Sequence, residues 1–130
     1  MSLIVRQAVI DCANARQLSR FWAAALDYDF ARDDEGAVVL HDPTGHGLPI
    51  EFQQVPEAKV VKNRVHLDLL PIDVPWEAEV ERLVTLGATK QRYVENPPDE
   101  AHWCMLDPEG NEFCCLRPWP VSHHERTSVL

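Results

Sequence analysis

The stretch VLHDPTG at residues 39–45 is matched by CMLDPEG at residues 104–110, and this repeat decides the fold. Asp42 and Asp107 begin two Asp-Pro-x-Gly turns and lie 65 residues apart. Asp, Pro and Gly favour tight turns because proline restricts φ, glycine tolerates positive φ and Asp binds nearby backbone amides. A common turn would explain each copy alone, but it would not explain the matched order of elements around both copies.

The segment before the first turn predicts a strand followed by a helix. Residues 4–12 are extended and rich in apolar side chains, and Asn14 is a favourable N-cap for a helix behind them. Apolar residues then recur at helical spacing, at positions Leu18, Phe21, Trp22, Ala25 and Leu26. Three short strands joined by turns are predicted next, at residues 28–32, 37–41 and 48–55.

The same order of elements returns in the second half of the chain. Residues 64–70 are extended, and a helix is predicted from Asp73 and Pro75 to Gly87. Three further strands are predicted at residues 89–94, 101–106 and 111–116. Each half alone has too few residues to cover its own sheet, so the two halves are expected to fold together.

The predicted fold class is therefore α+β, with two βαβββ modules in a single domain. The first module covers about residues 3–55 and the second about residues 64–118, with a linker at 56–63 and a tail at 119–130. The modules are expected to form one curved mixed sheet. The helices should cover its outer face, and a concave cleft should lie on the other face.

The composition argues against several kinds of partner. The 130 residues contain 21 acids against 12 Lys and Arg, a net charge of −9 that repels nucleic-acid phosphates and anionic membranes. No apolar run approaches the roughly 18 residues of a membrane span, and the N-terminus does not resemble a signal peptide, so a cytoplasmic protein is expected. The four cysteines lack CxxC spacing, which favours reduced thiols.

Three segments resemble the vicinal-oxygen-chelate superfamily, which contains glyoxalases, bleomycin-resistance proteins and extradiol dioxygenases. Residues 10–22 resemble its first strand and helix, and residues 61–69 and 106–114 resemble the fifth and eighth strands of its glyoxalase-like subgroup. Together with the repeat, the resemblance covers residues 4–118. It implies a small-molecule ligand and a homodimer, for which exposed strand edges give a physical reason.

The resemblance also implies a metal site with four ligands, one from the first and last strand of each module. By position, these ligands are Gln7, Glu51, His66 and Cys114. Cys114 departs from the family pattern, which places Glu there, and this departure argues against glyoxalase I activity. The ligand types suit a divalent ion such as Zn²⁺, Fe²⁺, Mn²⁺ or Ni²⁺.

Strand alternation places some of these side chains independently of the resemblance. Glu51 lies opposite Ile50 and Phe52, which should pack under the helices, so Glu51 is expected to face the cleft. By the same rule, Cys114 lies on the face opposite its two sequence neighbours, Phe113 and Cys115. The four candidate ligands can therefore converge.

His66 shares a strand face with Arg64 and Asp68, and Asp68 is a candidate to orient the His66 ring. The residues expected to contact the ligand are Gln7, Arg64, Asp68 and Trp103. His41 and His102 stand on strands just before the two turns and are secondary candidates to line the cleft.

Two functions remain open at this point. In the first, a metal-dependent enzyme of the lyase, isomerase or dioxygenase type chelates adjacent substrate oxygens and stabilises an oxyanion, with His66 and Glu51 as candidate catalytic residues. In the second, a metal-free module resembling the bleomycin-resistance proteins sequesters a ligand, and the acidic chain favours a cationic one. Glu51 would then pair with Arg64 or another cation, and Cys114 would be a small buried side chain.

Overall fold

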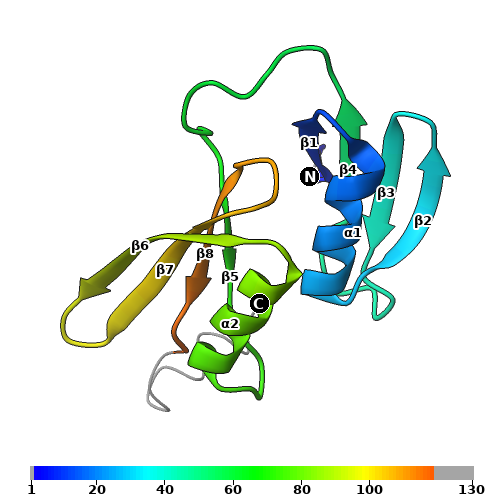
Figure 1. Cartoon of the computed structure of the whole chain (residues 1–130). Coiled ribbons are helices and arrows are strands. Elements are labelled where there is room, and N and C mark those ends of the chain that lie inside the picture. Colours follow the sequence, from blue (N-terminus) through cyan, green and yellow to red (C-terminus); the bar gives the residue numbers. More distant parts are fainter. Residues whose placement is uncertain (1, 119–130) are drawn as a thin grey trace. The chain divides into compact units, whose positions relative to one another are not determined.

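The computed structural model describes residues 2–118, which divide into two compact units. One unit ends at Val61 and the other begins at Lys62. Each unit contains one helix and one four-stranded mixed sheet in the order βαβββ, as Figure 1 shows. The predicted α+β class and the duplicated module are both confirmed.

The first unit has a sheet in the strand order β1-β4-β3-β2. Strand β1 runs parallel to β4, and the other neighbours are antiparallel. The helix α1 packs against β3 and β4. The elements are β1 (Ala8–Cys12), α1 (Ala15–Leu26), β2 (Asp29–Asp34), β3 (Ala37–His41) and β4 (Ile50–Gln54).

The second unit repeats this topology, with the strand order β5-β8-β7-β6. Strand β5 is parallel to β8, whereas β7 is antiparallel to both β8 and β6. Both sheets therefore have a parallel strand at the same edge, as expected for two copies of one repeated module. The elements are β5 (Leu67–Leu69), α2 (Trp76–Leu86), β6 (Thr89–Asn96), β7 (Glu100–Leu106) and β8 (Glu112–Leu116).

The core of the first unit follows from strand alternation. Ile50 and Phe52 are buried while Glu51 between them is only half-buried. In the sheet they pair with Leu40 and Val38, both of which are fully buried. Because α1 contributes further buried side chains, one face of the sheet becomes apolar and Glu51 points away from it.

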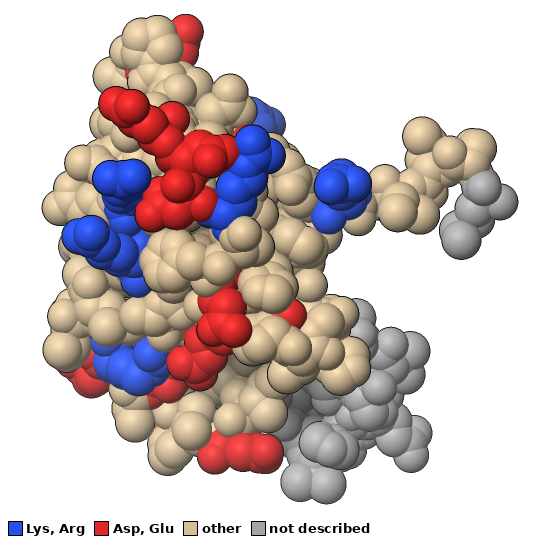
Figure 2. Space-filling model, turned by 90° about the vertical axis from the view of Figure 1, so that its right-hand side faces the viewer, with Lys and Arg blue, Asp and Glu red and all other residues tan. Residues whose placement is uncertain are grey.

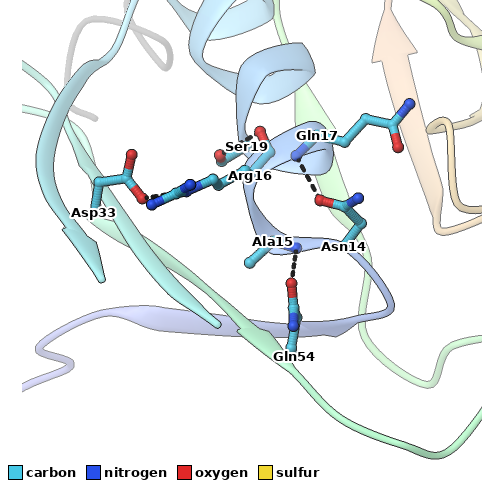
Figure 3. A network of polar contacts seen from close by, with 7 residues as sticks. All are labelled: Asn14, Ala15, Arg16, Gln17, Ser19, Asp33 and Gln54. Carbon is cyan, nitrogen blue, oxygen red and sulfur yellow. Dashed lines mark hydrogen bonds and ion pairs between the residues drawn. The ribbon is translucent and has the colours of Figure 1, made fainter. Parts of the chain in front are cut away.

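Two side-chain hydrogen bonds hold the N-terminus of α1, one of them from strand β4, as drawn in Figure 3. The Oδ1 of Asn14 accepts from the Gln17 backbone N–H at 3.0 Å, which confirms the predicted N-cap. The Oε1 of Gln54 accepts from the Ala15 N–H at 3.2 Å. Two otherwise unsatisfied amides of the first helical turn are thus satisfied, one of them by the neighbouring strand.

The two Asp-Pro-x-Gly turns have the same hydrogen-bonding pattern. The N–H of Gly45 donates to the Asp42 carbonyl at 2.9 Å, and the N–H of Gly110 donates to the Asp107 carbonyl at the same distance. The two glycines have φ of 78° and 87°, a region that other residues rarely adopt. The turn prediction is therefore confirmed in both modules.

Strand β5 is shorter than the predicted extended segment at residues 64–70. It pairs with β8 through only three residues, and Arg64 and Val65 form a bend before it. Edge-strand length depends on the partner strand, which local sequence does not encode.

The second helix begins at Trp76, with Pro75 as its N-cap. It does not begin at Asp73, because Asp73 has a positive φ of 59° that does not continue into a helix.

The surface carries interspersed charges of both signs. On the face in Figure 2, acidic side chains lie beside Lys and Arg side chains. Exposed ion pairs include Arg16 with Asp33 at 3.1 Å and Lys90 with Glu81 at 2.6 Å. Within residues 2–118, neither helix has the length and apolar character needed to cross a membrane.

Candidate functional site

The second sheet has an apolar face that packs against α2. Phe113 and Cys115 of β8 are both 1% exposed, and Trp76 of α2 donates from Nε1 to the Cys115 carbonyl at 3.1 Å. The charges of Glu79 and Arg82 on α2 also shift the pKa of the Cys115 thiol, so this side chain lies on the helix side of the sheet. Side chains that alternate with Phe113 and Cys115 therefore point away from α2.

The opposite face carries polar and metal-ligating side chains in one row across three strands. Asp68 of β5 lies opposite Cys114 of β8, and Cys114 lies opposite Cys104 of β7. His102 is two residues before Cys104 and so shares its face. We call these four residues, together with His66 just before β5, the polar face of the second sheet.

The polar face brings potential ligand atoms close together in two groupings. The Nε2 of His66 lies 3.3 Å from the Oδ1 of Asp68. Together with the Cys114 sulfur, the ligand atoms of His66 and Asp68 lie within 4.8 Å of one another. The second grouping, His102, Cys104 and Cys114, meets the same limit, with the two sulfurs 3.8 Å apart.

Burial is the main reason that the pKa of the Cys114 thiol is raised, to about 12. The hydrogen bond and charge of Cys104 raise it further, and Asp68 adds to the effect. A bound dication would reverse this preference, because a coordinated thiol loses its proton. Cys114 is therefore a neutral side chain by itself and a potential thiolate ligand beside a cation.

The first sheet brings Gln7 and Glu51 together. The Nε2 of Gln7, just before β1, donates to the Oε1 of Glu51 on β4 at 3.3 Å. Both side chains are half-buried, and Glu51 points away from the core face as strand alternation predicts. His41, a secondary candidate on β3 of the same unit, is exposed.

The predicted site residues thus form one pair in the first module and one cluster in the second. The orienting contact between Asp68 and His66 is present at 3.3 Å. That Gln7, Glu51, His66 and Cys114 share one ion stays a prediction, because these residues belong to two units.

The other two candidate ligand contacts lie elsewhere in the second module. Arg64 is exposed in the bend before β5. Trp103 pairs with Cys115, and its ring lies 5.5 Å from that of Tyr93, which contacts Trp76 of α2. Trp103 therefore stands on the helix side of the sheet, and a ligand-binding role for either residue stays a prediction.

Sequence reasoning did not identify Cys104 as a functional candidate, although a signal for it exists. The Asp107–Gly110 turn joins β7 to β8 and sets their antiparallel register. Counting outward from that turn pairs Leu106 with Glu112 and hence Cys104 with Cys114. Two cysteines at facing positions of a hairpin, with a histidine two residues away, are a recognisable ligand pattern.

Comparison with family models gives a match to a glyoxalase-like domain over residues 7–116. A comparison with curated proteins gives no match. Solved structures, in contrast, include many proteins of the same fold.

A glyoxalase/bleomycin resistance protein/dioxygenase family enzyme from Burkholderia phytofirmans PsJN is similar to this chain, with 17% identity and a TM-score of 0.68. The match covers 88% of this chain and 98% of that one. The fosfomycin resistance protein FosX from Mesorhizobium loti has 11% identity and a TM-score of 0.70, over 96% and 99% of the two chains.

A FosX variant from Listeria monocytogenes, complexed with Mn(II) and 1S,2S-dihydroxypropylphosphonic acid, has 11% identity and a TM-score of 0.69. That match covers 88% of this chain and 89% of the FosX chain. At these identities the structural likeness establishes the fold, and the family model establishes the family. The chain belongs to the glyoxalase-like domain family of the vicinal-oxygen-chelate superfamily.

Proposed function

We propose that this protein is a metal-dependent enzyme of the glyoxalase-like family that acts on a small molecule through two adjacent oxygen atoms. One observation carries the proposal. His66, Asp68 and Cys114 hold an imidazole, a carboxylate and a thiol with their ligand atoms within 4.8 Å of one another. Such clusters supply the nitrogen, oxygen and sulfur ligands that divalent transition metals use in proteins.

The chemistry of this cluster fits a divalent ion. Imidazole suits Zn²⁺, Fe²⁺ and Ni²⁺, carboxylate also suits Mn²⁺, and the Cys114 thiolate favours Zn²⁺. Asp68 either joins the ligands or holds the His66 ring through the contact between Nε2 and Oδ1 at 3.3 Å. In both cases the Asp68 carboxylate favours metal binding by the cluster, because it offsets the positive charge of the ion.

The first module supports the same proposal with its own polar pair. Glu51 is held by Gln7 at 3.3 Å on the side of its sheet opposite the buried Ile50 and Phe52. A half-buried carboxylate that is bonded to an amide and directed away from the core does not serve packing. The family resemblance assigns both residues to the metal, and we propose that both act as metal ligands.

A divalent ion bound by these residues would polarise the substrate oxygens and stabilise negative charge that develops on them. The chain itself contributes the orientation of His66, through Asp68, and an anionic carboxylate at Glu51. The Listeria FosX, which was solved with Mn(II) and a dihydroxy phosphonic acid, supports the choice of Mn²⁺ and of compounds with adjacent oxygens as probes.

The test is metal-dependent turnover by the full chain. Protein stripped with a chelator and reloaded with Mn²⁺, Zn²⁺, Fe²⁺ or Ni²⁺ would be assayed on fosfomycin, a hemithioacetal and a catechol. At least one metal should restore turnover, and Glu51→Ala should reduce it by at least about tenfold through loss of a ligand. Glu35→Ala removes an exposed carboxylate in the turn between β2 and β3 of the same module and is the matched control.

A wild-type chain that binds no metal under these conditions, yet binds a cationic ligand tightly, would contradict the proposal. That result would support the metal-free sequestering function instead. Loss of turnover in Glu35→Ala equal to that in Glu51→Ala would also contradict the assignment of Glu51, because the control residue lies outside the candidate set.

A further inference from the structure

Cys104 and Cys114 face each other across β7 and β8 with their sulfurs 3.8 Å apart. A tetrahedral Zn²⁺ with bonds of about 2.3 Å to two thiolates holds those sulfurs roughly 3.8 Å apart. The spacing of this cysteine pair therefore matches the edge of a zinc coordination tetrahedron. Paired strands fix this spacing more rigidly than a loop would.

His102 adds a third ligand on the same face. It lies two residues before Cys104 on β7, and its ring nitrogen is within 4.8 Å of both sulfurs. Two cysteines and one histidine form a ligand set that catalytic zinc sites use, with the fourth position left for water or substrate. The set is complete within the second module and needs no residue of the first.

The surroundings of the pair are polar. The Nη2 of Arg92 on β6 lies 4.0 Å from the Cys104 sulfur. Asp68 lies on the other side, as the sheet partner of Cys114. Cys114 is only 7% exposed and Cys104 is half-buried, so the sulfurs are shielded from bulk water without being sealed.

We infer that the second module contains a binding site for a thiophilic divalent ion of the Zn²⁺ class, formed by His102, Cys104 and Cys114. This site goes beyond the proposed function, because His102 and Cys104 are outside the four positions that the family resemblance assigns. Cys114 is common to both sites, so its thiolate binds one ion or bridges two. Cys104 belongs only to the zinc site and His66 only to the proposed site, so variants of these two residues distinguish the sites.

The test uses the full chain, freed of metal and kept reduced with a phosphine, and titrated with Co²⁺ and then Zn²⁺. Tetrahedral cobalt bound by two sulfurs gives an intense thiolate-to-metal absorption band in the near ultraviolet, and Zn²⁺ should abolish it at one ion per site. X-ray absorption of the zinc-loaded wild type should show two sulfur ligands. A spectrum with no sulfur ligand, or with only one, would overturn the inference without any variant.

Variants locate the site. Cys104→Ser and His102→Ala should each weaken zinc binding by at least about tenfold, and Cys104→Ser should also diminish the cobalt band. Cys12→Ser alters a buried thiol of the first module and should leave both unchanged. Circular dichroism and urea unfolding would establish that each variant is folded before its metal binding is compared.

The variants also separate this inference from the proposed function. If Cys104→Ser and His102→Ala retain full zinc affinity while His66→Ala loses it, the inference fails and the proposed site stands. If His66→Ala retains the ion and Cys104→Ser loses it, the zinc site stands and the proposed assignment of His66 fails.

Discussion

At the scale of single residues, Cys114 and Cys115 show how strand alternation gives neighbouring side chains different chemistry. The Cys114 sulfur faces Cys104 at 3.8 Å, whereas Cys115 is 1% exposed on the side of α2. Cys114 can therefore reach a cation on the polar face, and Cys115 serves as part of the core.

The first residue-scale prediction concerns stability at alkaline pH. Burial raises the pKa of Cys115 to about 11, above the value of about 8.5 expected in the unfolded chain. The contribution of Cys115 to stability is therefore fully present below about pH 8.5 and declines as pH rises toward 11. Urea unfolding between pH 7 and about pH 10.5 should show a smaller alkaline loss in Cys115→Ala than in the wild type. An equal loss would contradict the assignment.

The second residue-scale prediction concerns acid pH. The pKa of Asp42 is lowered, first by the hydrogen bond from the Thr44 hydroxyl at 2.7 Å and then by the Thr44 backbone N–H. Because its unfolded value is about 3.9, the carboxylate stabilises the turn above that pH and this contribution is lost as pH falls through the lower folded value. Thr44→Ala should flatten the acid limb of the stability profile, measured by urea unfolding from about pH 5 to pH 2.5. An unchanged limb would argue against the role of the hydroxyl.

At the scale of elements, the helix start at Asn14 is a point where local sequence determines structure. The Asn14 side chain caps the Gln17 N–H at 3.0 Å, as predicted (Figure 3). Asn14→Ala should lower the free energy of unfolding by about 1 kcal/mol, because an amide of the first turn loses its partner. Asn14→Asp keeps a capping oxygen and should stay within a few tenths of the wild type in the same urea titration. Equal losses in the two variants would contradict the capping argument.

Most elements could be predicted from the sequence because their signals are local. The cap at Asn14, the apolar spacing of α1 and the two Asp-Pro-x-Gly turns each act within a few residues. The predicted strand at 37–41 has the bounds of β3, since turns flank it closely on both sides.

Features that depend on partner strands could not be predicted in the same way. Strand β5 keeps only Leu67–Leu69, since its length is set by pairing with β8. The packing of Trp103 against Tyr93 depends on strand register, and so does the approach of Cys104 to Cys114. Part of the candidate site therefore arises from the register between strands. Inspecting potential ligand residues one at a time along the sequence does not reveal it.

At the scale of the whole molecule, the duplication is the feature that sequence and structure share most fully. Both modules have a parallel edge strand, an antiparallel remainder and the same turn. Their candidate ligands differ, because the first module holds an amide and a carboxylate and the second holds imidazoles, thiols and a carboxylate. The single-domain arrangement stays a prediction, and so does a site that draws on both modules.

A homodimer is the prediction that concerns assembly. Strands β1 and β2 are the edges of the first sheet, and Leu3, Ile4 and Val5 before β1 are between 77% and 86% exposed. Unpaired edges and a run of exposed apolar side chains favour association between copies. Light scattering of the full chain should give twice the chain mass of 14.8 kDa. Replacing Ile4 by Lys should shift the protein toward the monomer, and a monomeric wild type would contradict the prediction.

The central claim is that the polar face of the second sheet binds a divalent metal through His66. The most direct measurement is the metal content and metal affinity of the purified full chain, determined for the wild type, His66→Ala and a control, His46→Ala, which replaces an exposed histidine of the first module. We expect stoichiometric metal in the wild type and the control, and at least about a tenfold lower metal affinity in His66→Ala. Stoichiometric, equally tight metal in His66→Ala, or a wild type without metal after reloading, would contradict this claim.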